Sequence, residues 1–146
     1  MERTDFPQRA DAIAELVADD APDVLGLNEV ALWETAPWTL VQTPSGPLPV
    51  VTGPYTPTFD FEQLLLDALA AEGEPYTVVA TNSNFTSATI PIAIPISPTL
   101  AARFTDHDLI LVRDDALKHL TVSNVRSFNC SDASLFSVNL LGLNVQ

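Results

Sequence analysis

The segment Asp23-Val24-Leu25-Gly26-Leu27-Asn28-Glu29-Val30 decides the expected fold of this chain. A continuous apolar run of this length, placed after a helix, indicates a central strand that is buried on both faces. Its two polar residues, Asn28 and Glu29, fall at the C-terminal end of the run. In open α/β sheets, binding sites usually lie at this end of the strands. The segment therefore predicts both a central strand and the position of a site.

Two helices are expected, one on each side of this segment. The first has Asp5 as its N-cap and ends before Pro22, because the residue before a proline is steered away from helical geometry. The second repeats the pattern, with Asp60 as N-cap and Gly73 as its stop signal. Both carry apolar residues at helical spacing, which predicts one buried face for each helix.

The rest of the chain alternates strands with proline-rich stretches. Strands are predicted over residues 76–80, 108–113 and 121–129. Residues 34–58 are expected to form an ordered loop, with room for a short edge hairpin, and residues 81–105 an extended rim or lid. In both stretches the prolines would interrupt a central ladder. From residue 135 to the end the chain has apolar residues but no stop signal, which favours a gene fragment over a finished domain.

Composition narrows the possible functions. The chain has 146 residues, of which 47% are hydrophobic, so it can build a core. Its formal net charge of −13 disfavours nucleic acid as a substrate, because a polyanion such as DNA would be repelled unless divalent metal ions or a missing segment supplied positive charge. No apolar run is long enough to cross a bilayer, and the polar N-terminus predicts no signal peptide. The compartment stays open, because an upstream segment with its own signal can be missing. The single cysteine, Cys130, is expected to be a buried spectator thiol.

The first helix and strand also carry a family pattern. Residues 9–17 place an arginine and an isoleucine on the helix, and residues 21–30 read Ala-Pro-Asp-Val-Leu-Gly-Leu-Asn-Glu-Val. This closely resembles the endonuclease/exonuclease/phosphatase superfamily, whose members commonly show Pro-Asp-(apolar)-(apolar)-Gly-Leu-Gln-Glu-Val here. Residues 60–76 and 108–113 resemble later parts of the same domain. The resemblance implies an α/β (α+β) fold, part of a DNase I-like four-layer α/β/β/α sandwich. Residues 1–146 would be the N-terminal half of that domain, a mixed sheet with two covering helices.

The resemblance implies metal-assisted hydrolysis of phosphodiesters or phosphomonoesters. Glu29 would hold Mg²⁺ or Mn²⁺, which prefer oxygen ligands. Asn28 replaces the usual glutamine and would support that ligand with its amide, although a turn-forming role is as well favoured. Asn82, Asn84 and Trp33 are candidates for the substrate rim, against ordinary turn, strand-end and packing roles. Without the resemblance, Glu29 would be read as a capping or surface residue.

Several family motifs are missing from this sequence. No strand with an asparagine precedes the first helix, and Asn-Thr-His, Gly-Asp-x-Asn and the terminal Asp-His pair are absent. The two histidines, His107 and His119, lie outside those motifs and are expected to be solvated. The sequence therefore predicts a phosphoesterase that is inactive as this isolated chain. The alternative is a non-catalytic half-domain that binds a protein partner or associates with itself through an exposed sheet face.

Overall fold

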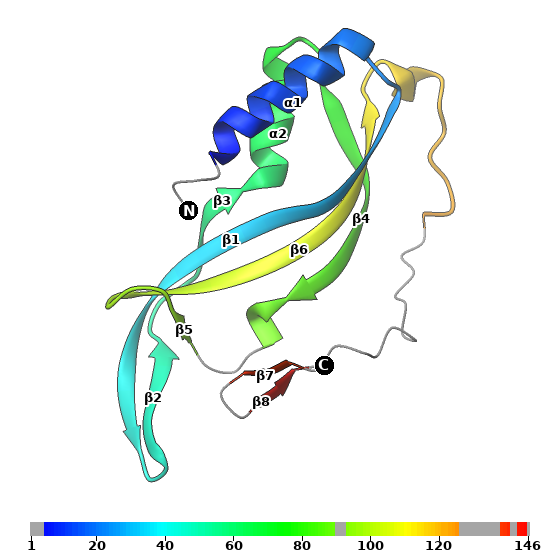
Figure 1. Cartoon of the computed structure of the whole chain (residues 1–146). Helices are drawn as coiled ribbons and strands as arrows, with labels where there is room; N and C mark the ends of the chain where they lie inside the picture. Colours follow the sequence, from blue (N-terminus) through cyan, green and yellow to red (C-terminus); the bar gives the residue numbers. More distant parts are fainter. Residues whose placement is uncertain (1–4, 90–92, 126–137, 141–142, 146) are drawn as a thin grey trace.

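A computed structural model describes residues 5–89, 93–125, 138–140 and 143–145 of the chain. The described part is an α+β fold with one main sheet, whose paired strands all run antiparallel, and two helices. Helices α1 (Phe6–Asp20) and α2 (Phe61–Ala71) lie together on one face of the sheet (Figure 1). No helix among the described residues is long and apolar enough to span a bilayer.

Both helices begin at the caps that the sequence indicates. The Asp5 carboxylate accepts the N–H of Gln8 at 3.3 Å, and the Asp60 carboxylate accepts the N–H of Gln63 at 3.1 Å. Each cap satisfies one of the backbone donors left free at a helix start. After α2, Gly73 adopts a φ of 86°, which an amino acid with a side chain tolerates poorly, and the chain turns into the next strand. Both predicted helices are therefore confirmed.

The sheet is built around two long strands, β1 (Val24–Thr43) and β6 (Leu100–Arg113). Strand β4 (Tyr76–Thr86) pairs with β6, and the order across the sheet is β2-β1-β6-β4. Strand β2 (Gly46–Val51) forms a hairpin with the end of β1, and β3 (Thr56–Asp60) also pairs with β1. The remaining elements are short: η1 (Ser87–Thr89), β5 (Ile94–Pro95), η2 (Ala116–Lys118), β7 (Val138–Leu140) and β8 (Leu143–Val145).

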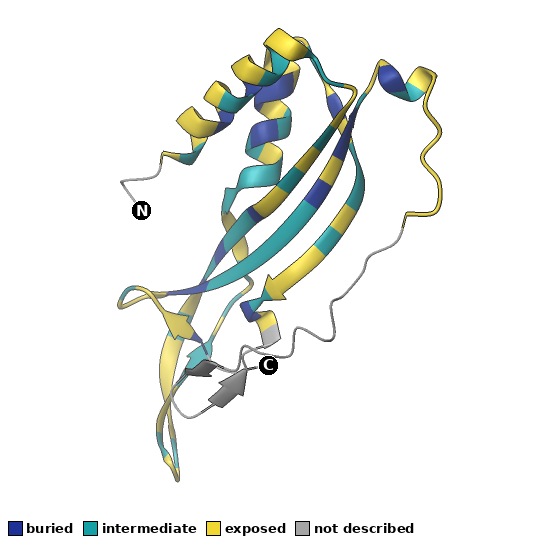
Figure 2. Ribbon diagram, turned by 45° about the vertical axis from the view of Figure 1, so that its right-hand side comes forward, coloured by how far each residue is buried: buried dark blue, intermediate teal, exposed yellow. Residues whose placement is uncertain are grey.

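The core lies between the two helices and the part of the sheet that they cover (Figure 2). Ala10 and Ala14 of α1 are fully buried, and their small side chains let the helix pack closely. Leu65 and Leu69 of α2 fill the space above the sheet, together with Leu109 and Leu111 of β6. Burying a leucine fully contributes roughly 1.5–3 kcal/mol, so this contact holds the helices on the sheet.

Four expectations from the sequence need correction. The apolar run 24–30 is not a strand buried on both faces, because Val24 and Gly26 are exposed on the face opposite the helices. The run also does not end at Glu29, since β1 continues to Thr43. Residues 34–58 are largely strand, namely the rest of β1, β2 and part of β3. Residues 81–105 include the end of β4 and the start of β6 rather than only a rim.

The prolines explain the misreading of these stretches. Pro47 and Pro49 lie in β2, the outermost strand, where a missing N–H leaves the ladder with β1 intact. In the stretch predicted as a strand over 121–129, residues 121–125 form no regular element, and residues 126–129 lie outside the described part. Cys130 also lies outside it. Between the described strands all pairing is antiparallel, so the expected mixed sheet is not found there. The four-layer sandwich stays a prediction.

Candidate functional site

The face of the sheet opposite α1 and α2, called the open face below, carries the candidate site. Strand β6 has no bulge of its own, so its side chains alternate regularly between the two faces of the sheet. Leu109 and Leu111 point to the helices, and the even-numbered residues of the strand point away from them. The open-face residues of β6 are therefore Phe104, Asp106, Asp108 and Ile110. Strand pairing places their neighbours from β1 and β4 on the same face.

Three aromatic rings form a row across the open face. Trp33 of β1 and Phe104 of β6 are paired residues whose ring centroids lie 4.7 Å apart. Phe85 of β4 continues the row at 6.2 Å from Phe104 and is 44% exposed. Trp33 and Phe104 are half-buried, so part of each side chain remains exposed to solvent. The row therefore offers aromatic surface to a ligand.

Next to this row lies a band of carboxylates and amides. Asp106 accepts the Asn84 side-chain amide at 3.3 Å, and Asn84 in turn accepts the Asn82 amide at 2.7 Å. Asp108 pairs with Asn82 in the ladder and lies two residues along β6 from Asp106, a separation of about 7 Å along a strand. The band therefore sets two carboxylates beside the aromatic row on one face.

Asp108 also fixes a bulge in β1. Residues 28 and 29 together face Asp108, because Leu27 pairs with Leu109 and Val30 already pairs with His107. Glu29 takes a φ of 57° there, and its N–H donates to the Asp108 carboxylate at 3.2 Å. A left-handed conformation is unusual for a residue with a side chain and costs about 1–2 kcal/mol.

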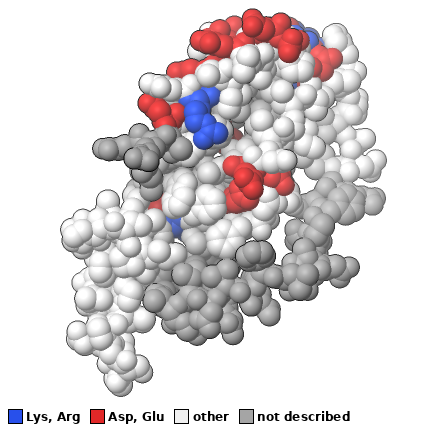
Figure 3. Space-filling view, viewed as in Figure 1, with Lys and Arg blue, Asp and Glu red and all other residues white. Residues whose placement is uncertain are grey.

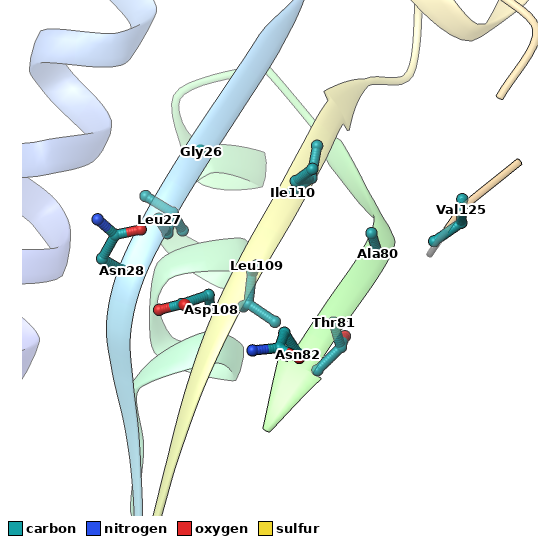
Figure 4. A pocket seen from close by; sticks show the side chains of 10 residues that line it. All are labelled: Gly26, Leu27, Asn28, Ala80, Thr81, Asn82, Asp108, Leu109, Ile110 and Val125. Carbon is teal, nitrogen blue, oxygen red and sulfur yellow. The ribbon is translucent and has the colours of Figure 1, made fainter. Parts of the chain in front are cut away.

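The band borders a hollow of about 280 Å³. Its polar lining comes from Asn28, Thr81, Asn82 and Asp108, and Ile110 and Val125 supply apolar surface. Figure 4 shows the Asp108 carboxylate reaching from β6 towards β1, with Asn82 on the neighbouring strand. Gly26 lines the hollow as well, and a methyl group added there would meet no atom within 4 Å. The hollow therefore has free space beside the strand at this position.

The cations of the described chain are engaged elsewhere. Arg103 binds Glu34 at 2.6 Å on the helix side of the sheet, Arg113 binds Asp23 at 2.7 Å, and Lys118 binds Asp115 at 2.6 Å. Hydrogen bonding to Glu34 and to Asp23 raises the pKa of Arg103 and of Arg113, so both stay charged. Within the described ranges, no ion pair neutralises Asp106 or Asp108.

The structure brings together most of the residues that the sequence singled out. Asn28 and Asn82 line the same hollow, Asn84 lies in the adjoining band, and Trp33 begins the aromatic row. Glu29 is exposed, lies at the bulge and is not among the lining residues. Among the described residues, no three His, Cys, Asp or Glu side chains come together around a possible metal position. Mg²⁺ or Mn²⁺ at Glu29 therefore stays a prediction.

Four further residues were missed by sequence reasoning, namely Phe85, Phe104, Asp106 and Asp108. Their neighbours in the sheet come from strands that are distant in the sequence, so no local pattern indicates that these residues lie together. If the predicted strand had been extended back to residue 100, its alternation would have placed Phe104, Asp106 and Asp108 on one face, but it would not have indicated Phe85.

No protein-family model matches the chain, and neither a curated protein nor a solved structure is significantly similar to it.

Proposed function

We propose that the protein is a non-catalytic binding module whose open face holds an organic cation. The ligand class is a molecule with an ammonium or guanidinium group and some apolar surface. The observation that carries the proposal is the aromatic row Trp33–Phe104–Phe85 beside the carboxylates of Asp106 and Asp108. Aromatic faces attract cations with about 0.5–2 kcal/mol, and a carboxylate adds a direct charge interaction.

The net negative charge of the chain favours a cationic ligand over an anionic one. A chain with 19 acidic and 6 basic residues repels phosphates and carboxylates, and its summed field attracts cations. Figure 3 shows acidic side chains over the helical end and a smaller acidic group over the middle of the long strands. A phosphoester substrate would need bound metal ions or a further positive segment to approach this face.

An organic cation also suits the geometry better than a bare metal ion. Magnesium needs several oxygen ligands at about 2 Å, whereas an ammonium group needs one or two carboxylates and a ring face. Asp106 and Asp108 lie on the same face of β6 with their Cα atoms about 7 Å apart, which leaves room between the two side chains for a group of several heavy atoms.

Calorimetric titration with choline, arginine amide and spermidine tests the proposal. The matched control is 3,3-dimethyl-1-butanol, which has the shape of choline without its charge. At least one cation is expected to bind with a Kd of about 0.1–1 mM, and the uncharged alcohol at least about tenfold more weakly. Binding of choline and the alcohol with equal affinity, or of none of the three cations, would overturn the proposal.

Three variants distinguish the effect of charges on the open face from the effect of the net charge on cation binding. Asp106→Asn and Asp108→Asn keep a hydrogen-bond acceptor and remove one charge from the open face. Asp11→Asn removes the same charge from the exposed side of α1. Each open-face variant is expected to weaken cation binding by about tenfold, and the α1 variant by less than about twofold. Equal effects of all three would mean that only the net charge matters.

A further inference from the structure

We infer that the chain associates with a second copy of itself through the uncharged end of its sheet. This surface, called the distal tip below, comprises the hairpin 38–51 and the residues 94–100 packed against it. It lies at the end of the sheet away from the helices (Figure 1). The inference is independent of the open-face site.

The distal tip exposes an unusual amount of apolar surface. Among the described residues, 13 large hydrophobic residues are exposed, and six of them lie here: Leu40 (54%), Val41 (43%), Leu48 (38%), Ile94 (37%), Ile96 (49%) and Leu100 (40%). Strand alternation puts Leu40 on one face of the hairpin and the paired Val41 and Leu48 on the other, so both faces present apolar side chains. Single exposed apolar residues are normal, but six on one projecting element are typical of an interaction surface.

The tip is an ordered unit rather than a loose loop. The Trp38 indole N–H donates to the Ser97 carbonyl at 2.9 Å, and the Ala93 N–H donates to the Pro49 carbonyl at 3.1 Å. The hairpin and the segment after residue 93 therefore hold each other in place. Its apolar side chains are presented on a fixed backbone, which lowers the entropy cost of docking.

Charge is excluded from this end of the molecule. Residues 35–59 and 75–102 contain no Asp, Glu, Lys, Arg or His, although the whole chain carries −13. On the face seen in Figure 3, the described part of the lower end carries neither acidic nor basic side chains. Within the described part, the charges gather instead on the helices and on the stretches of sheet beside them.

This segregation favours a second copy as the occupant. Two copies repel each other strongly unless their acidic ends stay apart. Ten residues of extended strand separate Val30, in the core, from Leu40, which is about 33 Å. Contact between two tips would therefore keep the acidic ends several Debye lengths apart, because that length is about 8 Å at physiological salt. An uncharged apolar surface also matches itself without any charges to pair, as a two-fold interface requires.

The edge of the hairpin limits the association to a closed dimer. Strand β2 is the outermost strand, and Pro47 and Pro49 remove two of its N–H donors. Prolines at a sheet edge block the addition of further strands, which would otherwise build fibres. The tips therefore meet through side chains rather than by extending the sheet.

Sedimentation velocity and light scattering of the full chain test the inference. The wild type is expected at twice 15.7 kDa at high micromolar concentration and physiological salt. Leu40→Asp combined with Leu48→Asp should give the 15.7 kDa species. Leu16→Asp combined with Leu120→Asp changes two exposed leucines outside the tip and should leave the dimer intact. A monomeric wild type at all salt concentrations would refute the inference, as would equal effects of the two double variants.

A second measurement covers the case in which the tip variant does not fold. In a Cys130→Ser background, Thr39→Cys places a thiol on the tip, and Asp11→Cys places one on α1. Mild oxidation is expected to cross-link the tip variant into a covalent dimer at least about tenfold faster than the α1 variant. Equal cross-linking rates would contradict docking through the tip. Because choline binding uses the open face, loss of dimerisation alone would leave the proposed function unaffected.

Discussion

Glu34 and Arg103 form a two-pronged ion pair across β1 and β6, with both N–O distances at 2.6 Å. The Glu34 side chain is 10% exposed and that of Arg103 is 31% exposed. The Arg103 guanidinium also lies over the ring of Tyr55, 4.4 Å from its centroid. The pair therefore ties the two long strands together beyond the end of the helices.

Glu34→Gln is expected to lower the free energy of unfolding by about 1–3 kcal/mol. The substitution leaves the guanidinium without its charge partner in a partly buried place, and the cost is below the 3–5 kcal/mol of a fully buried pair because Arg103 is about one third exposed. Lys118→Met breaks the exposed pair with Asp115 and should cost less than about 1 kcal/mol. Urea unfolding of both variants checks this, and equal losses would contradict the structural role of the Glu34 pair.

Glu29→Gly is expected to stabilise the protein by about 1 kcal/mol. Glycine adopts the left-handed conformation of the bulge without steric cost, whereas Glu29 is strained at a φ of 57°. Glu29→Val should destabilise by at least as much, because a β-branched side chain is worse there. Thermal unfolding of the two variants gives the comparison. Destabilisation by glycine would mean that the Glu29 side chain makes a contact that outweighs the strain.

The two glycines Gly53 and Gly26 should respond differently to alanine. A methyl group at Gly53 would lie 2.8 Å from the Pro37 side chain, so Gly53→Ala is expected to cost about 1–3 kcal/mol. Gly26 meets nothing within 4 Å, and Gly26→Ala is expected to be neutral or to stabilise by up to about 1 kcal/mol. Unfolding in urea measures both. A costly Gly26→Ala would show that the strand needs this glycine for a reason other than space.

Tyr76 makes the stability of the fold sensitive to alkaline pH. Its hydroxyl donates to the Pro22 carbonyl, and burial is the main cause that raises its pKa above the ordinary value of 10.0. Because the folded state holds the proton more tightly, the contribution of Tyr76 is complete below about pH 10 and is lost as pH rises through the raised pKa.

Tyr76→Phe therefore separates two effects. It should lower stability at neutral pH by about 1 kcal/mol through the lost hydrogen bond. It should also flatten the decline in stability that the wild type shows above about pH 10. The free energy of unfolding, measured at intervals across the alkaline range, tests both effects. An alkaline decline of the same size in the variant would assign it to other groups.

Local signals in the sequence sufficed for the helices but not for the strands. Asp5 and Asp60 mark helix starts because capping acts within four residues, and the structure confirms both. The ends of the strands depend instead on pairing partners far along the chain. Trp33 pairs with Phe104, 71 residues later, and no local pattern indicates that distance.

The sequence indicated some single residues of the candidate site but not how they are grouped in space. Asn28, Asn82, Asn84 and Trp33 were singled out individually, and the structure places all of them on or beside the open face. Their grouping depends on the register of β1 and β4 against β6, which the sequence alone does not specify. Glu29 was expected at a strand end because two polar residues after an apolar run are typical of the end of a strand. In the structure, residues 28 and 29 form a bulge with one extra residue, and the strand continues from Val30.

The most direct test of cation binding on the open face is a choline titration followed by ¹H–¹⁵N NMR, with the two tryptophan indoles as internal reporters. Trp33 belongs to the aromatic row, whereas the Trp38 indole is bound to the Ser97 carbonyl in the distal tip. If choline binds the open face, the Trp33 indole and backbone amides in 80–85 and 104–110 will show saturable shifts, with little change at Trp38. Shifts confined to other parts of the molecule, or none at millimolar choline, would contradict it.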